Sequence, residues 1–162
     1  MSPAVAIREK HDGELADRSS VRLWLRLLSC TMAIEKDVQR RLAERFGTTL
    51  PRFDLLAALD RQPEGLTMSA LSRALLVSNG NVTQLVQKLA AEGLVATTPS
   101  PTDRRSSIVR LTDKGQRHFT ELAEAHHGWI DALFASLDPA EREALYAGLG
   151  HLKTAIGKGK AA

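Results

Sequence analysis

Residues 78–89 include many side chains that form hydrogen bonds but carry almost no charge. Apolar residues in this segment recur at intervals of three, four and seven positions, which predicts a helix with one buried face. The apolar residues are Val82, Leu85, Val86 and Leu89. The opposite face carries amides and hydroxyls, whose donors and acceptors suit recognition of a partner through hydrogen bonds. The residues of this polar face are Asn81, Thr83, Gln84, Gln87 and Lys88.

A second set of candidate residues is cationic. Residues 97–117 contain five cations and two acids, so this window carries the entire +3 formal net charge of the 162-residue chain. Arg104 and Arg105 are adjacent within it and follow Asp103. Guanidinium groups bind phosphate, and an acid two positions before Arg105 can orient its guanidinium group or stabilise the turn. The mild average charge therefore conceals a local basic segment.

The sequence around the polar segment predicts two helices that would position it. Thr67 caps a short helix, and Ser78 caps the helix with the polar face, which ends at Gly93. The buried positions expected in the short helix are Leu71, Ala74 and Leu75. A short helix, a tight turn and a second helix with a polar face form the helix-turn-helix arrangement, which places its second helix in the major groove of DNA.

Two β-prone runs follow, at residues 94–98 and 107–111, and they predict a hairpin with the two arginines at its tip. Such a tip would meet the DNA backbone or the narrow minor groove. The pattern favours a DNA-binding module with a wing.

Long helices are expected on both sides of this module. The first, at residues 19–46, has an apolar stripe that we expect to be buried: Leu23, Leu27, Cys30, Ile34, Val38 and Leu42. A second apolar stripe exceeds what a helix in a small monomer buries, so we expect a partner chain to cover it. That stripe comprises Val21, Trp24, Leu25, Leu28 and Met32.

Three further helices complete the expected order. One begins at Pro51, and one runs from residue 112 to about 137. The last follows a capping box at residues 138–141 and carries an apolar stripe. The stripe consists of Leu145, Leu149, Leu152 and Ile156.

Residues 50–115 resemble the MarR family of winged-helix transcriptional regulators. The wing signature of that family appears as Asp103-Arg104-Arg105 followed by residues 109–115, which read V-R-L-T-D-K-G. The helix signature appears at residues 81–89, N-V-T-Q-L-V-Q-K-L, followed by G-L-V at 93–95. The resemblance extends over the flanking long helices and omits only the ends of the chain.

The resemblance implies a mainly α fold with a small β-hairpin wing, that is, a winged helix-turn-helix. We expect a single domain at 19–156, in which 19–46 and 112–156 are dimerisation helices and 50–111 is the DNA-binding lobe. Residues 1–18 and 157–162 are expected to be flexible tails.

The family resemblance also implies a homodimeric repressor that a small effector releases from a palindromic operator on double-stranded DNA. It implies that Arg105 inserts into the minor groove while Asp103 holds it. Thr67, Ser69 and Arg73 either contact phosphate or serve only as caps and solvated residues. The expected DNA-binding residues are Thr67, Ser69, Arg73, Ser78, Asn79, Asn81, Thr83, Gln84, Gln87, Lys88, Asp103, Arg104 and Arg105.

An effector is implied between the dimerisation helices and the DNA-binding lobe. The candidate residues are Trp24, Arg26, Phe53, His118 and Phe119. The three aromatic residues are more readily interpreted as core, and Arg26 either pairs with an anionic ligand or points to solvent. The run at residues 78–83 is similar to the MarR subgroup that controls aromatic-acid catabolism, so an aromatic carboxylate or its CoA thioester is the implied effector.

Other functions find little support in the sequence. Catalysis is not expected, because no Gly-rich phosphate loop, nucleophile elbow or H-E-x-x-H pattern is present. No cofactor or metal is expected, since His127 and Asp131 supply only two ligands. Cys30 is interpreted as an inert buried thiol. No membrane span is apparent, so we expect a cytoplasmic protein. A non-sensing or a redox- or metal-responsive winged-helix protein remains the alternative.

Overall fold

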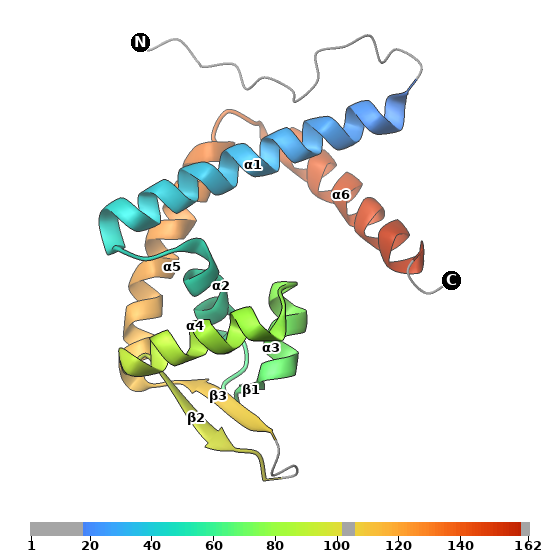
Figure 1. Cartoon of the computed structure of the whole chain (residues 1–162). Helices are drawn as coiled ribbons and strands as arrows, with labels where there is room; N and C mark the ends of the chain where they lie inside the picture. Colours follow the sequence, from blue (N-terminus) through green and yellow to red (C-terminus); the bar gives the residue numbers. More distant parts are fainter. Residues whose placement is uncertain (1–17, 102–105, 160–162) are drawn as a thin grey trace. The chain divides into compact units, whose positions relative to one another are not determined.

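The computed structural model describes residues 18–101 and 106–159 (Figure 1). The chain forms two compact units, a first unit that ends at His126 and a second unit that begins at His127. Helices α1 (Ser19–Phe46), α2 (Leu50–Asp60), α3 (Met68–Leu75) and α4 (Asn79–Ala91) belong to the first unit. So do strands β1 (Leu66–Thr67), β2 (Val95–Pro99) and β3 (Ser107–Leu111). Helix α5 (Asp113–Phe134) crosses the boundary, and α6 (Pro139–Gly159) lies in the second unit.

Helix α1 has the predicted bounds but not the predicted buried stripe. Its C-terminal half packs on α2 and buries Val38 and Leu42, and the helix ends where Gly47 adopts a left-handed φ of 60°. In the N-terminal half only Leu25 is buried. The prediction that Leu23 and Cys30 are buried is therefore wrong, because both are exposed. The regular apolar spacing identifies a face of the helix, but α2 covers only the end of that face.

The core of the first unit lies between α2, α3, α4, α5 and the sheet. Helix α3 has only eight residues, so a single position, Leu71, is fully buried in it. The expectation that Ala74 and Leu75 are also buried is wrong, since Ala74 is exposed and Leu75 is half-buried. The other fully or nearly buried side chains are Phe53, Leu55, Leu56, Leu59, Val82, Val86, Leu89, Leu94, Val95, Val109, Phe119 and Leu122.

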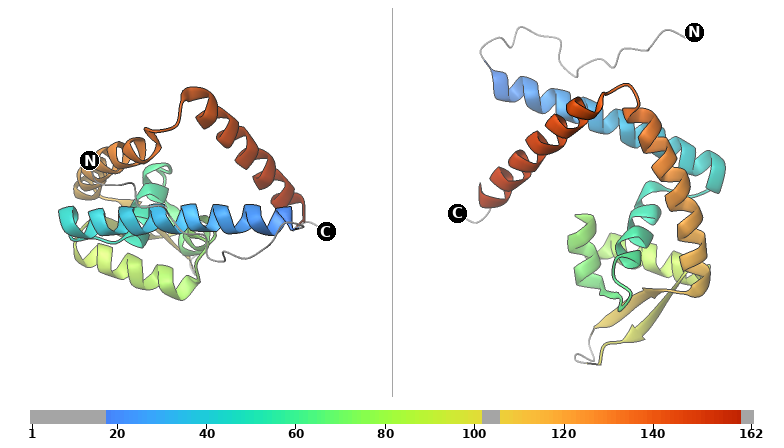
Figure 2. Two further views of the ribbon diagram at one scale, coloured as in Figure 1. Left: turned by 90° about the horizontal axis from the view of Figure 1, so that it is seen from above. Right: turned by 180° about the vertical axis from the view of Figure 1, so that it is seen from behind.

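The sheet contains three antiparallel strands in the order β1-β3-β2. The predicted hairpin is present, with Val95 opposite Leu111 and Pro99 opposite Ser107. Strand β1 was not predicted, because two residues are too few for an alternating pattern. Figure 1 and the right-hand view of Figure 2 show β2 and β3 side by side, extending away from α2, α3 and α4.

A close contact joins the start of α5 to the start of β2. The Thr112 hydroxyl donates to the Gly93 carbonyl (2.7 Å) and accepts from the Gly115 N–H (3.0 Å). A Cβ atom on Gly115 would lie 1.9 Å from the carbonyl oxygen of Leu94. Only glycine therefore fits at residue 115 without displacing the backbone of Leu94.

The second unit contains the end of α5 and all of α6. The predicted capping box is present: the Asp138 N–H donates to the Glu141 carboxylate, and the Glu141 N–H donates to Asp138 Oδ1, both at 2.9 Å. Helix α6 continues to Gly159, three residues beyond the end that periodicity suggested. Among the helices described, none combines the length and the hydropathy that a membrane crossing requires.

Candidate nucleic-acid interface

The turn between α3 and α4 is fixed by hydrogen bonds at both helix starts. Thr67 Oγ1 accepts from the Ala70 N–H (3.2 Å), and Ser78 Oγ accepts from the Asn81 N–H (3.4 Å), so both predicted N-caps are confirmed. Within the turn, the Ser72 hydroxyl donates to the Val77 carbonyl (2.6 Å). These contacts fix where the first turn of α4 begins.

Helix α4 presents a polar face opposite its buried face. Val82, Val86 and Leu89 are buried beneath it. No hydrogen bond ties the exposed side chains of this face to another part of the chain that the structure describes, so their polar groups are available to a partner. The exposed residues are Asn79, Asn81, Gln84, Gln87 and Lys88.

Thr83 differs from the other residues expected on the polar face. It is half-buried, and its hydroxyl donates to the Asn79 carbonyl (2.9 Å). This bond occupies the hydroxyl proton within the helix. Thr83 therefore offers a partner its methyl group more readily than a hydrogen-bond donor.

Helix α3 places its candidate residues in two environments. Thr67 is half-buried and its oxygen is used as the cap, whereas Ser69 and Arg73 are exposed. Because they are exposed, Ser69 and Arg73 are accessible to a phosphate group.

The tip of the wing, with Asp103, Arg104 and Arg105, lies outside the described residues. At the base of the tip, the Ser100 N–H donates to the Ser106 carbonyl (2.9 Å) and Ser100 is buried.

One further cation lies on the described part of the wing and was not among the expected DNA-binding residues. Arg110 Nη1 donates to Thr98 Oγ1 (3.3 Å), and Arg110 Nη2 lies 3.9 Å from a carboxylate oxygen of Glu64. The sequence counts Arg110 toward the local charge but does not reveal these contacts.

The C-terminal end of α4 is held by charged groups from two other helices. Arg52 of α2 donates to the Glu92 carboxylate, and Lys114 Nζ of α5 donates to the Glu92 backbone carbonyl (2.7 Å). The hydrogen bond from Arg52 lowers the pKa of Glu92, and the charges of Arg52, His118 and Lys114 act in the same direction. The Nε atom of Arg52 is buried and has no acceptor among the described residues. His118, expected near an effector, thus lies close to this ion pair.

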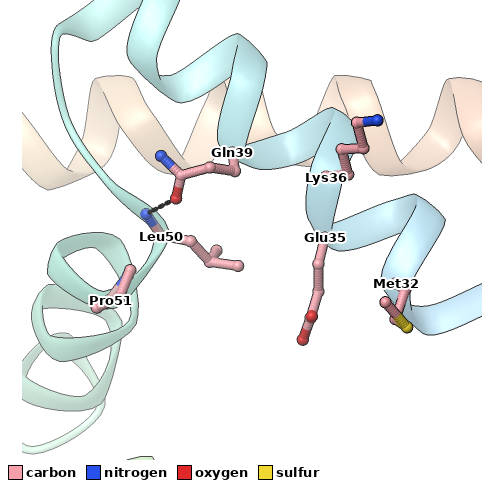
Figure 3. A pocket seen from close by; sticks show the side chains of 6 residues that line it. All are labelled: Met32, Glu35, Lys36, Gln39, Leu50 and Pro51. Atoms are coloured by element: carbon pink, nitrogen blue, oxygen red, sulfur yellow. Dashed lines mark hydrogen bonds between the residues drawn. The ribbon is translucent and has the colours of Figure 1, made fainter. Parts of the chain in front are cut away.

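A hollow of about 350 Å³ lies between α1 and the start of α2 (Figure 3). Gln39 Oε1 accepts from the Leu50 N–H (2.8 Å) at one end of it, and the Glu35 side chain extends into the space. Partial burial raises the pKa of Asp54, and the negative charge of Glu35 acts in the same direction. The lining residues are Met32, Glu35, Lys36, Gln39, Leu50 and Pro51.

None of the five expected effector residues lines this hollow. Phe53 and Phe119 are core residues whose ring centroids lie 5.7 Å apart, as the core interpretation predicted. Trp24 is 56% exposed, so its interpretation as core is wrong. Arg26 is exposed on α1. The lining was missed because it forms only where the turn after α1 brings Leu50 back toward that helix.

The described residues include one close pair of potential metal ligands on α5. His127 Nε2 lies 3.1 Å from Asp131 Oδ2 on the surface of α5. Within residues 18–101 and 106–159, no group of three or more His, Cys, Asp or Glu side chains could hold a metal ion.

Comparison with known proteins agrees with this geometry. A family model described as MarR family matches residues 46–106. The chain is 34% identical over 105 residues to the transcriptional activatory protein BadR of Rhodopseudomonas palustris, covering 64% of this chain and 59% of BadR. It is 30% identical over 116 residues to the HTH-type transcriptional regulator YfiV of Bacillus subtilis, covering 72% of each protein.

A solved structure extends the match over nearly the whole fold. The crystal structure of a MarR family transcriptional regulator from Silicibacter pomeroyi superposes with a TM-score of 0.74 and 30% sequence identity. The match covers 89% of this chain and 99% of that one. Proteins of this family bind DNA and are not enzymes. The winged helix-turn-helix, the family match and these similarities together establish that the chain belongs to the MarR family of transcriptional regulators.

Proposed function

We propose that this protein is a cytoplasmic homodimeric repressor that binds a palindromic operator and leaves it when a small effector binds. The observation that carries the proposal is the exposed polar face of α4, which is rich in hydrogen-bonding groups and nearly uncharged. A solvated helix face in a protein of this composition would ordinarily carry several charges. Amides without partners in the described chain suit the edges of base pairs better.

The candidate residues divide between sequence readout and backbone contact. Gln84 and Gln87 read adenine through paired hydrogen bonds, and the Thr83 methyl group contacts a thymine methyl. Asn79, Asn81 and Lys88 flank them on the same face. Contacts to phosphate come from Ser69, Arg73 and Ser78, and from the wing residues Arg104 and Arg105, with Asp103 orienting Arg105.

Large apolar side chains exposed on two helices support a dimer. On α1 they are Val21, Leu23, Trp24 and Met32. On α6 they are Leu145, Tyr146, Leu149 and Ile156. A monomer that left these groups in water would lose the free energy of burying them, so we assign both surfaces to the interface with a second copy. Two-fold symmetry then presents two recognition helices to two half-sites.

The hollow between α1 and α2 is the proposed effector site. Its volume falls within the range of small-molecule pockets, and it lies between a proposed dimerisation helix and the DNA-binding lobe. The apolar side chains of Met32 and Leu50 would contact the ring of an aromatic carboxylate or of its CoA thioester, and Lys36 is the cation of the lining that would pair with a negative charge. Binding would release DNA only if this ligand prefers the spacing of the recognition helices that does not fit the operator.

The proposed direction of regulation is repression. A dimer bound across a promoter represses by occupancy, and effector binding relieves the block. BadR, by contrast, is described as an activatory protein. Transcription in vitro from a template carrying the operator should fall when the protein is added, and a rise would reverse this assignment.

Selection of DNA from a random pool tests the proposal as a whole. The enriched sequences should be palindromic, with half-sites about one helical turn apart. Thermal-shift measurements with aromatic acids, their CoA thioesters and matched aromatic amines should give stabilisation by the acids or thioesters, together with release of the enriched duplex. Recovery of no enriched sequence would refute the DNA-binding role, whereas stabilisation by the amines alone would refute only the effector class.

A further inference from the structure

Five glycines lie among the described residues of the first unit, and local structure explains four of them. Three have a left-handed backbone, with φ values of 60°, 86° and 73°, which other residues rarely adopt: Gly47, Gly65 and Gly93. The fourth, Gly115, meets the backbone of Leu94 so closely that no Cβ atom fits. The fifth, Gly80, has neither a left-handed backbone nor a close neighbour that would exclude a side chain.

Gly80 lies in the first turn of α4, outside the left-handed region, and it is exposed. A Cβ atom built there would meet no heavy atom within 4 Å. Glycine within a helix lowers its stability relative to alanine, because the unfolded backbone loses more freedom on folding. The free protein therefore gains nothing from this glycine that the described structure reveals.

The position of Gly80 on α4 places it on the same side of the helix as the residues assigned to DNA. Gly80 precedes Gln84 by four residues and Gln87 by seven, so the three lie along one side of α4. Helical side chains lean toward the N-terminus, so Gln84 leans over the turn that contains Gly80. The missing side chain thus lies within the face that we assign to DNA.

We infer that Gly80 is a position of close approach to DNA, an inference that rests on the proposed function. Without a side chain at this point, the first turn of α4 can lie directly against the edge of the major groove. Asn81 and Gln84 then reach the base edges. A side chain at residue 80 would hold the turn away from the groove and lengthen those hydrogen bonds beyond their useful range.

Two substitutions at residue 80 and one control test this role. Gly80→Ala adds a methyl group, and Gly80→Gln adds a longer uncharged side chain that is also compatible with a helix. Gly128→Ala is the matched control, because Gly128 is a glycine of α5 whose Cβ atom would likewise meet nothing within 4 Å. Each variant is measured for its Tm and for its affinity toward the duplex that the wild-type protein enriches from a random pool.

Stability and affinity should change in opposite directions at residue 80. Gly80→Ala and Gly128→Ala should each raise the Tm by about 1 to 4 °C. Gly80→Ala should weaken binding of the duplex at least tenfold and Gly80→Gln should weaken it further, while Gly128→Ala should bind as the wild type does. Sedimentation of each variant verifies that its oligomeric state is unchanged.

Different results would overturn either the role of Gly80 alone or the proposed function as well. Wild-type affinity in both residue-80 variants would overturn the close-approach role and leave DNA binding intact. A fall in the Tm of Gly80→Ala would also overturn it, because glycine would then serve the free protein. An equal loss of affinity in Gly128→Ala would do the same, since the effect would not be local. If the wild-type protein enriches no duplex, the proposed function fails and this role fails with it.

Discussion

Gln84 provides the most direct test of sequence readout by α4. Its side chain is exposed at the centre of the polar face and forms no hydrogen bond with the described residues, so Gln84→Ala removes a recognition group without disturbing a contact within them. A paired hydrogen bond from glutamine to adenine contributes about 1 to 3 kcal/mol of discrimination. A dimer on a palindrome makes this contact twice, so the loss should total about 2 to 6 kcal/mol, at least about thirty-fold in affinity.

Fluorescence anisotropy with the enriched duplex measures this loss, and a set of single base-pair changes assigns it to a position. The wild-type protein should lose affinity when one A·T pair in each half-site is replaced, and Gln84→Ala should be insensitive to that replacement. Glu124→Ala, an exposed substitution on α5, serves as a control and should bind normally. Unchanged affinity of Gln84→Ala, or equal losses at every base pair, would refute base readout by this residue.

Four further predictions concern the wing, the fold and the dimer. Arg105→Ala should weaken operator binding more than tenfold with an unchanged circular-dichroism spectrum, and retained affinity at moderate salt would rule out the wing contact. Gly115→Ala should lower the free energy of unfolding by about 3 kcal/mol, because its Cβ atom would overlap the carbonyl oxygen of Leu94, the residue before β2; a urea midpoint equal to that of the wild type would contradict this overlap. The pKa of Glu92 is lowered by Arg52, so the stabilisation from this pair is full above the unfolded pKa near 4.5 and is lost as pH falls through the folded pKa. Since the pair is partly exposed, Glu92→Gln should cost about 1 kcal/mol or less at pH 6 and almost nothing at pH 3, and a cost that does not depend on pH would contradict the pairing. Trp24→Glu should shift sedimentation from dimer to monomer, and an intact dimer would exclude this face of α1 from the interface.

Local signals in the sequence were sufficient for most of the fold. The caps at Thr67 and Ser78, the capping box before α6 and the bounds of α1 and β3 depend on residues close together in the chain, and the structure confirms them. Strand β1 could not be predicted, since its two residues become a strand only by pairing with Val109 and Ile108 far along the chain.

Burial was harder to predict than secondary structure. Periodicity identifies the apolar faces of α1, but it does not show which neighbour covers them, so the predicted buried stripe includes Leu23 and Cys30, which are exposed. The same limit applies to the hollow between α1 and α2, which depends on how the segment after Gly47 returns to Gln39. The face of α4 was predictable because the helix alone determines it. Thr83 is the exception, since its hydroxyl bonds to its own helix.

The central claim is that this protein binds a specific DNA sequence through α4 and anchors itself by the charge of the wing. The affinity of the wild-type protein for the enriched duplex and for a scrambled duplex of equal composition, measured across a range of salt concentrations, tests it most directly. We predict at least about a thousand-fold preference for the enriched duplex and a steep linear fall of the logarithm of affinity with the logarithm of salt concentration. Equal affinity for the two duplexes, or affinity that does not change with salt, would contradict the claim.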